Sequence, residues 1–222
     1  DRASSTPCRL VVLDIPTIYF QRCVMHAWVA GATGYTGQAV IRALRARLID
    51  TTAHVRPDSP ELGRWRGHFA SMGAQVDASP WEAEALKRRM AEVNPTLVFA
   101  LLGTTRARRR TAEHPDQENY EKVDHDLTRM LLDAAAHLPL PPRFVYLSAM
   151  GTRQGSRSPY GRARARIEAA LTESGVPHVI ARPGFIAGPD REESRPMERF
   201  AAASSDLLLS GIAAVGGQRF RD

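Results

Sequence analysis

The stretch Gly31-Ala32-Thr33-Gly34-Tyr35-Thr36-Gly37 decides the fold of this 222-residue chain. It follows the apolar run 27–30 and precedes apolar residues at helical spacing, namely Val40, Ile41, Leu44 and Leu48. A strand, a tight glycine turn and a helix start in this order let the backbone approach a pyrophosphate, to which the helix N-terminus offers N–H groups and a positive dipole end. The glycine spacing is GxxGxxG rather than the common GxGxxG. The interpretation as a pyrophosphate site therefore depends on the strand before the turn and the helix after it. The alternative is a glycine-rich hairpin without a ligand, which would need a second strand where the sequence shows a helix.

Beyond this turn, strand-like apolar runs alternate with helical patterns. The runs lie at 53–55, 75–76, 97–102, 144–147 and 179–181. Strands that alternate with helices indicate a parallel sheet, and the continuous apolar character of 97–102 and 144–147 is typical of central strands covered on both faces. The sequence therefore predicts an α/β fold, a Rossmann-type doubly wound parallel sheet in a single domain.

Two segments between the strands are interpreted differently. The segment from 63 to 73 is short of periodic signal and is predicted to be an irregular connection. One helical face is predicted from apolar residues at helical spacing, ended by prolines at 139, 141 and 142. Its members are Tyr120, Val123, Leu127, Met130, Leu131, Ala134 and Leu138.

Composition and charge exclude several classes of protein. Hydrophobic residues make up 43% and charged residues 24% of the chain, and no apolar run has the roughly 18 residues of a membrane span, so we expect no membrane partner. The net charge of +6 comes almost entirely from scattered arginines. Their densest cluster, at 106–110, could attract a polyanion, yet no nucleic-acid module accompanies it and we expect no nucleic-acid partner.

The N-terminal part of the chain carries little signal. Cys8 and Cys23 form neither a disulfide framework nor a metal-binding spacing, so we expect no metal site. Residues 1–24 have no secretory layout and are treated as an extension of uncertain structure, with an added edge strand at 10–13 as the alternative. We therefore expect a cytoplasmic protein, with the dinucleotide-binding domain at 25–222 and a short substrate-side segment at 183–222.

Residues directly after the strands are the candidates for cofactor contacts, because ligands of such sheets bind outside the carboxyl ends of the strands. Arg56 stands where an NAD-selective site carries an acidic residue, and a guanidinium there can take a 2′-phosphate bidentately. This favours NADP, with NAD as the alternative. Asp77 could accept the adenine amino group, and Leu102-Gly103-Thr104-Thr105 offers a small backbone surface and hydroxyls. The pyrophosphate contacts are expected at Gly31, Thr33, Gly34, Tyr35, Thr36 and Gly37.

An ordered set of segments resembles the atypical short-chain dehydrogenase/reductases, in particular the NAD(P)H-binding group with the NmrA-like and Tat-interacting oxidoreductase-like proteins. The segments are Gly31–Gly37, Leu102–Thr105, Tyr146–Gly151, Tyr160–Arg164, Arg182–Gly184 and Asp190–Pro196. The resemblance implies a Rossmann fold, a nicotinamide cofactor with further contacts at Pro183 and Gly184, and, in active members, a Ser/Tyr/Lys reaction centre.

This resemblance assigns three residues to a reaction centre. Ser148 matches the serine that polarises a substrate carbonyl, and Tyr160 the tyrosine that exchanges the proton accompanying hydride transfer. Arg164 stands in place of the family's lysine, which holds the nicotinamide ribose and assists the tyrosine. Arginine supplies charge and donors there, but with a planar head that does not exchange its proton.

Two functions of different class remain open at this point. The first is an NADP-preferring oxidoreductase acting on a small carbonyl or hydroxyl compound, as a monomer or homodimer. The second is a non-catalytic NAD(P) sensor that reports redox state to a regulatory protein partner, favoured by Arg164 and by the short segment 183–222. Ser148 and Tyr160 favour the enzyme.

Overall fold

A computed structural model describes residues 25–104, 119–184 and 186 of the chain. Its elements follow one another as β1 (His26–Ala30), α1 (Tyr35–Arg45), β2 (Asp50–His54), α2 (Leu62–Ser71), β3 (Gln75–Asp77), α3 (Ala83–Val93), β4 (Leu97–Ala100), the π-helical segment η2 (Tyr120–Asp126), α5 (Leu127–Ala136), β5 (Arg143–Leu147), α6 (Pro159–Glu173) and β6 (His178–Ala181).

The strands form one parallel sheet in the order β3-β2-β1-β4-β5-β6. Chain order runs outward from β1 in one direction to β3 and then, from β4, in the other direction to β6. This is the strand order of a doubly wound Rossmann sheet, and its switch point lies between β1 and β4. The fold class predicted from the sequence is confirmed.

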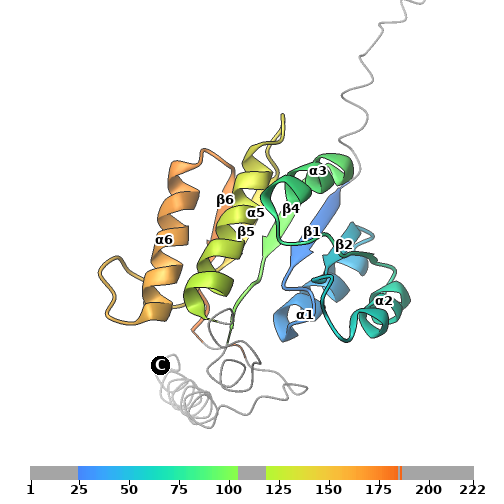
Figure 1. Ribbon diagram of the computed structural model, residues 1–222, viewed down its shortest axis with the longest axis horizontal. Helices are drawn as coiled ribbons and strands as arrows, with labels where there is room; N and C mark the ends of the chain where they lie inside the picture. Colours follow the sequence, from blue (N-terminus) through green and yellow to red (C-terminus); the bar gives the residue numbers. More distant parts are fainter. Residues whose placement is uncertain (1–24, 105–118, 185, 187–222) are drawn as a thin grey trace, which may run out of the picture.

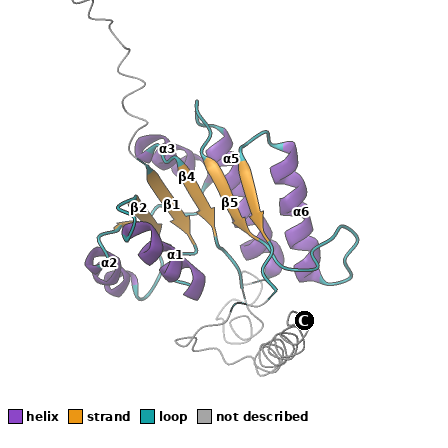
Figure 2. Cartoon of the chain, turned by 180° about the vertical axis from the view of Figure 1, so that it is seen from behind, coloured by secondary structure: helices purple, strands orange, loops and turns teal. Residues whose placement is uncertain are grey.

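Helices cover the sheet in two layers. In Figure 1, α3, α5 and α6 lie in front of the strands, and the view from behind in Figure 2 brings α1 and α2 forward. The side chains follow this division, because Trp28 and Val98 point into the core beneath α3, α5 and α6. Val29 and Ala53 point into the core beneath α1 and α2. The central strands are therefore covered on both faces, as their apolar sequences predict.

The prediction of an irregular connection over 63–73 is wrong, because α2 occupies Leu62–Ser71. Gly63 and Gly67 weaken the periodic signal, but both stand in open space where a helix tolerates them. The helix is held by its aromatic residues: Phe69 is fully buried, and the rings of Trp65 and Phe69 stack one turn apart with centroids at 5.6 Å. Burial against the sheet thus stabilises α2 although its two glycines give the segment a low helix propensity.

The helix after the glycine turn is shorter than the predicted stripe. It ends at Arg45, and Leu48 adopts a left-handed conformation with φ 58° and an exposed fraction of 87%. Ile49 is buried instead, where the chain turns back towards β2. Leu48 therefore belongs to the turn and not to the apolar face of α1.

The apolar helical face predicted from Tyr120 to Leu138 differs from the observed buried face at its start. Val123 and Leu127 are only half-buried, whereas Asp124 and Thr128 are completely buried. The cause is η2, since a π-helix holds more residues per turn than an α-helix and shifts which side chains face inward. Asp124 thereby occupies the buried position that the α-helical period assigns to Val123.

Within residues 25–104 and 119–184, no helix combines the length and the apolar character needed to cross a membrane. The extension at 1–24 with its alternative edge strand at 10–13, the arginine cluster at 106–110 and most of the segment 183–222 lie outside the described residues.

The burial of Phe69 makes α2 testable. Phe69→Ala leaves a cavity between α2 and the sheet and is expected to lower the free energy of unfolding by roughly 3–5 kcal/mol. Leu48→Ala is the control, because this leucine is 87% exposed, and its effect is expected to stay within about 0.5 kcal/mol. Urea unfolding followed by circular dichroism measures both values, and similar losses in the two variants would contradict the assignment of Phe69 to the core.

Candidate functional site

The glycine turn lies at the switch point of the sheet. Ala30 pairs with His54 of β2 on one side and with Ala100 of β4 on the other, so Gly31 emerges between two parallel neighbours. Gly31 has φ +79°, and a Cβ on it would lie 2.6 Å from the carbonyl oxygen of Leu101. A left-handed conformation and a close approach to β4 both require glycine here.

Gly37 lets helix α1 start directly against this turn. A Cβ on Gly37 would overlap the carbonyl oxygen of Gly31 and would lie 2.7 Å from that of Ala32. Gly34 is different, because its Cβ would meet only the carbonyl oxygen of Gly31, at 3.3 Å. Gly37 therefore serves the packing of the chain itself, whereas the space at Gly34 is open towards a ligand.

The N-terminus of α1 suits an anionic ligand. Gly34 is the N-cap and no side chain caps the helix, and the first turn, which begins with Tyr35 and Thr36, holds no acidic residue. Thr33 turns its carbonyl oxygen to the side chain of Gln38, which donates to it over 3.0 Å. The positive end of the helix dipole thus points out of the carboxyl edge of the sheet without a carboxylate to neutralise it.

The residues predicted after β2 and β3 lie on the neighbouring part of this edge. Arg56 follows the end of β2 with a half-exposed side chain whose Nε lies 3.7 Å from Asp58. Asp77 ends β3 and is buried, with one carboxylate oxygen accepting from the backbone N–H of Ser79 at 2.9 Å and the other from Arg89 Nε. Burial alone would raise the pKa of Asp77, but these hydrogen bonds outweigh it and hold the pKa below the usual value.

The Asp77 carboxylate is thus already engaged within the protein. A contact with adenine would have to use a remaining lone pair of these oxygens.

Arg164 is the most heavily bonded residue of the predicted reaction centre. Its guanidinium donates from Nη2 to Asp124 Oδ1 at 2.7 Å and to the carbonyl oxygen of Leu102 at 3.2 Å, and from Nη1 to the carbonyl oxygen of Leu147. Only 4% of Arg164 is exposed. The side chain thus ties the ends of β4 and β5 to helix α6, and its head is directed into the protein.

Asp124, which lies in η2, is the charged partner of Arg164. Its second oxygen accepts the backbone N–H of Thr104 at 3.1 Å, so both carboxylate oxygens are used. Burial raises the pKa of Asp124, and the charge of Arg164 and the Thr104 N–H oppose the rise. Tyr146, whose hydroxyl lies 3.4 Å from Arg164 Nη1, has its pKa raised to about 12, chiefly by burial. The tyrosine therefore remains a neutral acceptor beside the ion pair.

The loop after β4 is packed against this pair. A Cβ on Gly103 would lie 2.9 Å from Arg164 Nη2, so a larger residue would press on the guanidinium. The hydroxyl of Thr104 is buried with no hydrogen-bond partner among the described residues. Thr105, predicted as a cofactor contact, lies outside the described residues.

Ser148 is also engaged by a neighbour. Its hydroxyl donates to Glu168 Oε1 at 2.6 Å, and the same carboxylate binds Arg182 through Nε at 2.8 Å and Nη2 at 2.9 Å. Burial alone would raise the pKa of Glu168, but the hydrogen bonds from Arg182 and Ser148 lower it, which keeps the group an ionised acceptor. Since a serine hydroxyl has one proton, Ser148 polarises a carbonyl only after turning away from Glu168.

Tyr160 lies in the first turn of α6, over the guanidinium. The carbon Cζ of Arg164 is 5.1 Å from the centre of the Tyr160 ring, and the ring of Tyr120 meets it edge-on at 5.3 Å. Pro183 and Gly184 follow β6 beside Met150, whose backbone N–H donates to the Pro183 carbonyl oxygen at 3.0 Å. All predicted site residues within the described range therefore lie at or beyond the carboxyl edge of the sheet.

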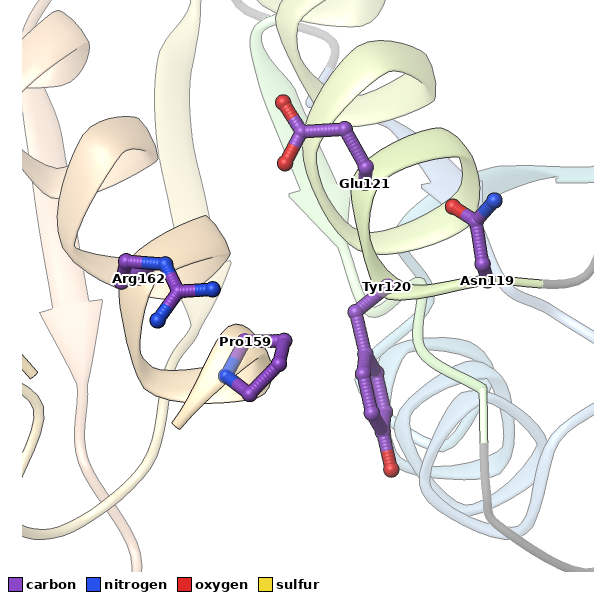
Figure 3. Close-up of a pocket in the computed structure, with 5 residues that line it drawn as sticks. All are labelled: Asn119, Tyr120, Glu121, Pro159 and Arg162. Atoms are coloured by element: carbon purple, nitrogen blue, oxygen red, sulfur yellow. The ribbon is translucent and has the colours of Figure 1, made fainter. Parts of the chain in front are cut away.

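A cleft opens beside Tyr160, between the starts of η2 and α6. Figure 3 shows Asn119, Tyr120 and Glu121 on one side and Pro159 and Arg162 on the other. Its volume of about 170 Å³ is below the roughly 300–1,000 Å³ of typical small-molecule sites. The cleft borders the predicted reaction centre and is too small to hold a dinucleotide.

Sequence reasoning missed Asp124, Glu168 and Tyr120. The available signal was spacing, because Tyr120 and Asp124 repeat the interval of Tyr160 and Arg164, and Glu168 lies one further turn along α6. The π-helical turn concealed Asp124, since the α-helical period directs this residue towards solvent.

The different surroundings of Gly34 and Gly37 predict different variants. Gly34→Val is expected to keep the fold and to lose dinucleotide binding, because its side chain enters the space before the helix N-terminus. Gly37→Val is expected to destabilise the protein itself, since it strikes backbone of its own turn. Fluorescence titration with NADPH and thermal unfolding separate the two effects, with Gly63→Ala as the control. Normal binding by Gly34→Val would place the phosphate site elsewhere.

Curated proteins similar to this chain include two from fungi. "Protein fmp52-1, mitochondrial" of Aspergillus terreus is 29% identical over 82% of this chain and 76% of its own length. "Protein fmp52, mitochondrial" of Emericella nidulans is 31% identical with the same coverage. The expectation of a cytoplasmic protein is wrong, because these relatives are named as mitochondrial proteins.

Solved structures share the fold at low sequence identity. UDP-glucose 4-epimerase of Thermotoga maritima, solved with UDP-glucose, has a TM-score of 0.59 and 18% identity over 76% of this chain. The Bordetella bronchiseptica enzyme WbmH, solved with NAD+, has a TM-score of 0.59 and 16% identity over 82%. This chain spans 58% and 62% of these two solved chains, respectively.

A family profile agrees with the geometry of the glycine turn. The family described as NAD(P)H-binding matches residues 31–205, which begin at the first glycine of the turn and include every predicted site residue. The chain belongs to this NAD(P)H-binding family.

Proposed function

We propose that this protein is an NADP-preferring oxidoreductase that interconverts a small carbonyl compound and its alcohol, with Tyr160 exchanging the proton. The observation that carries the proposal is the placement of Tyr160 on the same sheet edge as the glycine turn, in a chain of the NAD(P)H-binding family. The pyrophosphate site and the proton donor then lie at the same edge of the sheet. Transfer of a hydride and a proton to one substrate requires this arrangement.

The residues present fit a nicotinamide dinucleotide. The pyrophosphate would lie on the open side of Gly34 before α1, and the adenosine half would extend past the ends of β2 and β3. Arg56 would meet the ribose 2′-phosphate, and Asp77 would border the adenine. The nicotinamide half would lie along Leu102–Thr104, Pro183 and Gly184. The bound cofactor would supply or take up the hydride.

The proposed mechanism assigns the remaining chemistry to the chain. The Tyr160 hydroxyl gives its proton to the carbonyl oxygen as that oxygen gains negative charge, and takes a proton back in the reverse direction. Ser148 polarises the carbonyl once its hydroxyl leaves Glu168. Arg164 supplies a fixed positive charge under the Tyr160 ring.

Cofactor preference is tested at Arg56. NADP(H) is expected to bind more tightly than NAD(H) by about 1.5–3 kcal/mol, the range of a hydrogen bond to a charged group. Arg56→Ala removes this preference and leaves NAD(H) binding nearly unchanged. Arg64→Ala, which removes an exposed arginine paired with Glu61 on α2, is the control. Titration of each variant with the four cofactors measures the effect, and equal affinities in the parent would refute the preference.

Turnover is tested at Tyr160 and Arg164. With NADPH and a panel of carbonyl compounds, Tyr160→Phe is expected to lower kcat by about 10²–10⁴-fold without weakening cofactor binding, because it removes only the proton. Arg164→Lys restores the family's residue and is expected to maintain or raise the rate. NADPH oxidation followed by absorbance gives both values, and an unchanged rate in Tyr160→Phe would exclude its role.

A non-catalytic NAD(P) sensor is the second candidate. It is favoured by the contacts of Ser148 with Glu168 and of Arg164 with Asp124, which engage both groups within the protein. Tight NADPH binding with no turnover of any compound, in the parent or in Arg164→Lys, would favour the sensor. Turnover that arises only in Arg164→Lys would mark the parent as a binding protein whose reaction centre has decayed.

We also propose a mitochondrial location, on the basis of the similar fungal proteins named as mitochondrial. Immunofluorescence of the protein in its own cells, with an antibody against this chain and a mitochondrial marker, tests it, and a diffuse signal would oppose it.

A further inference from the structure

Helices η2 and α6 meet through two matched pairs of residues, one helical turn apart. The ring of Tyr120 meets that of Tyr160 edge-on, with centroids at 5.3 Å and planes at 66°. Asp124 Oδ1 lies 2.7 Å from Arg164 Nη2. The same interval on both helices brings an aromatic pair and an ion pair into register along one contact line.

The position of Arg164 depends on Asp124 more than on its other partners. Leu102 and Leu147 offer only neutral carbonyl oxygens, which do not balance the charge of a guanidinium that is almost fully buried. Asp124 supplies the opposite charge and is itself fixed, because its second oxygen accepts the N–H of Thr104. Its side chain has no exposed surface, so water does not take over its role.

The guanidinium in turn forms part of the surface on which Tyr160 rests. Its carbon Cζ lies 5.1 Å from the centre of the Tyr160 ring and 5.5 Å from that of Tyr146, so the charge stands between two aromatic side chains. A displacement of the guanidinium would therefore change both the contact beneath Tyr160 and the charge that it experiences.

We propose that Asp124 is a positioning residue, which acts through Arg164 to fix the Tyr160 ring. Its consequence for catalysis rests on the proposed function, since only an oxidoreductase uses the Tyr160 proton. In this arrangement Arg164 serves Tyr160 and the ends of β4 and β5, and leaves the cofactor ribose to other groups. The π-helical turn allows the ion pair with Arg164 to form, because it directs Asp124 into the protein interior.

The test compares Asp124→Asn with Asp133→Asn. Both variants remove one carboxylate charge on the continuous helix η2–α5, but Asp133 forms a half-exposed ion pair with Arg129, away from the site. The full chain is labelled with ¹³C in its tyrosine rings, and Tyr160→Phe identifies the Tyr160 signal. Asp124→Asn is expected to shift this signal and Asp133→Asn to leave it in place.

Binding and turnover give a second readout that a purely structural role would not produce. In Asp124→Asn the NADPH dissociation constant is expected to stay within about twofold of the parent's, while kcat falls by about tenfold or more. This split arises because Arg164 acts on the proton donor and not on the cofactor. An unshifted Tyr160 signal, or an unchanged kcat beside a weakened NADPH affinity, would overturn the proposal.

A double variant protects the test against misfolding. Asp124→Asn leaves the Arg164 charge buried without its partner, whereas Asp124→Asn with Arg164→Met removes both charges and fills the space with a flexible apolar chain. This variant is expected to fold and to show the same shift of the Tyr160 signal, and a folded variant with an unshifted signal would refute the proposal.

The two proposals fail in different ways. If the parent does not bind NADPH, the proposed function is refuted, but the Tyr160 signal still decides whether Asp124 positions the ring. If NADPH binds and the ring does not move, only the role of Asp124 is lost.

Discussion

The absence of side chains at Gly31 and Gly37 is the constraint on which the site depends. At Gly31 it lets the turn after β1 pass against the carbonyl of Leu101, which directly follows β4, and at Gly37 it lets α1 begin against that turn. The helix N-terminus is thereby brought to the switch point of the sheet, where a dinucleotide binds in this fold. A side chain at either position would separate elements that the sheet register holds together.

A second constraint operates at the other half of the same edge. The Arg164 guanidinium joins the ends of β4 and β5 to α6, and Asp124 of η2 balances its charge. Because buried ion pairs add little net stability compared with apolar packing, we attribute to this pair a role in fixing the geometry of the site. The Ser148–Glu168–Arg182 contacts act similarly and fix the end of β5 against α6 and the end of β6.

The sequence carried enough information for the sheet and for the phosphate turn. Apolar runs and glycine spacing are local patterns, and each strand predicted from them within residues 25–104 and 119–184 has a counterpart in the structure. Helix α2 was missed because burial of Phe69, a tertiary effect, compensates for two glycines. Asp124 was missed because a π-helical turn changes the period that the interpretation assumed. Family resemblance brought Arg164 into view, but only the fold shows that its head is directed inward.

The parallel sheet also has a consequence for how this protein folds. Residues that meet at the site are far apart in the chain, since β1 pairs with β4 across about seventy residues and Asp124 meets Arg164 across forty. Contacts of this kind bear a large loop-closure cost before they contribute stability, and they slow folding. The switch point of the sheet therefore forms only when the central strands have come together. A ligand that binds there recognises the native state alone and raises the stability of the whole domain with its concentration.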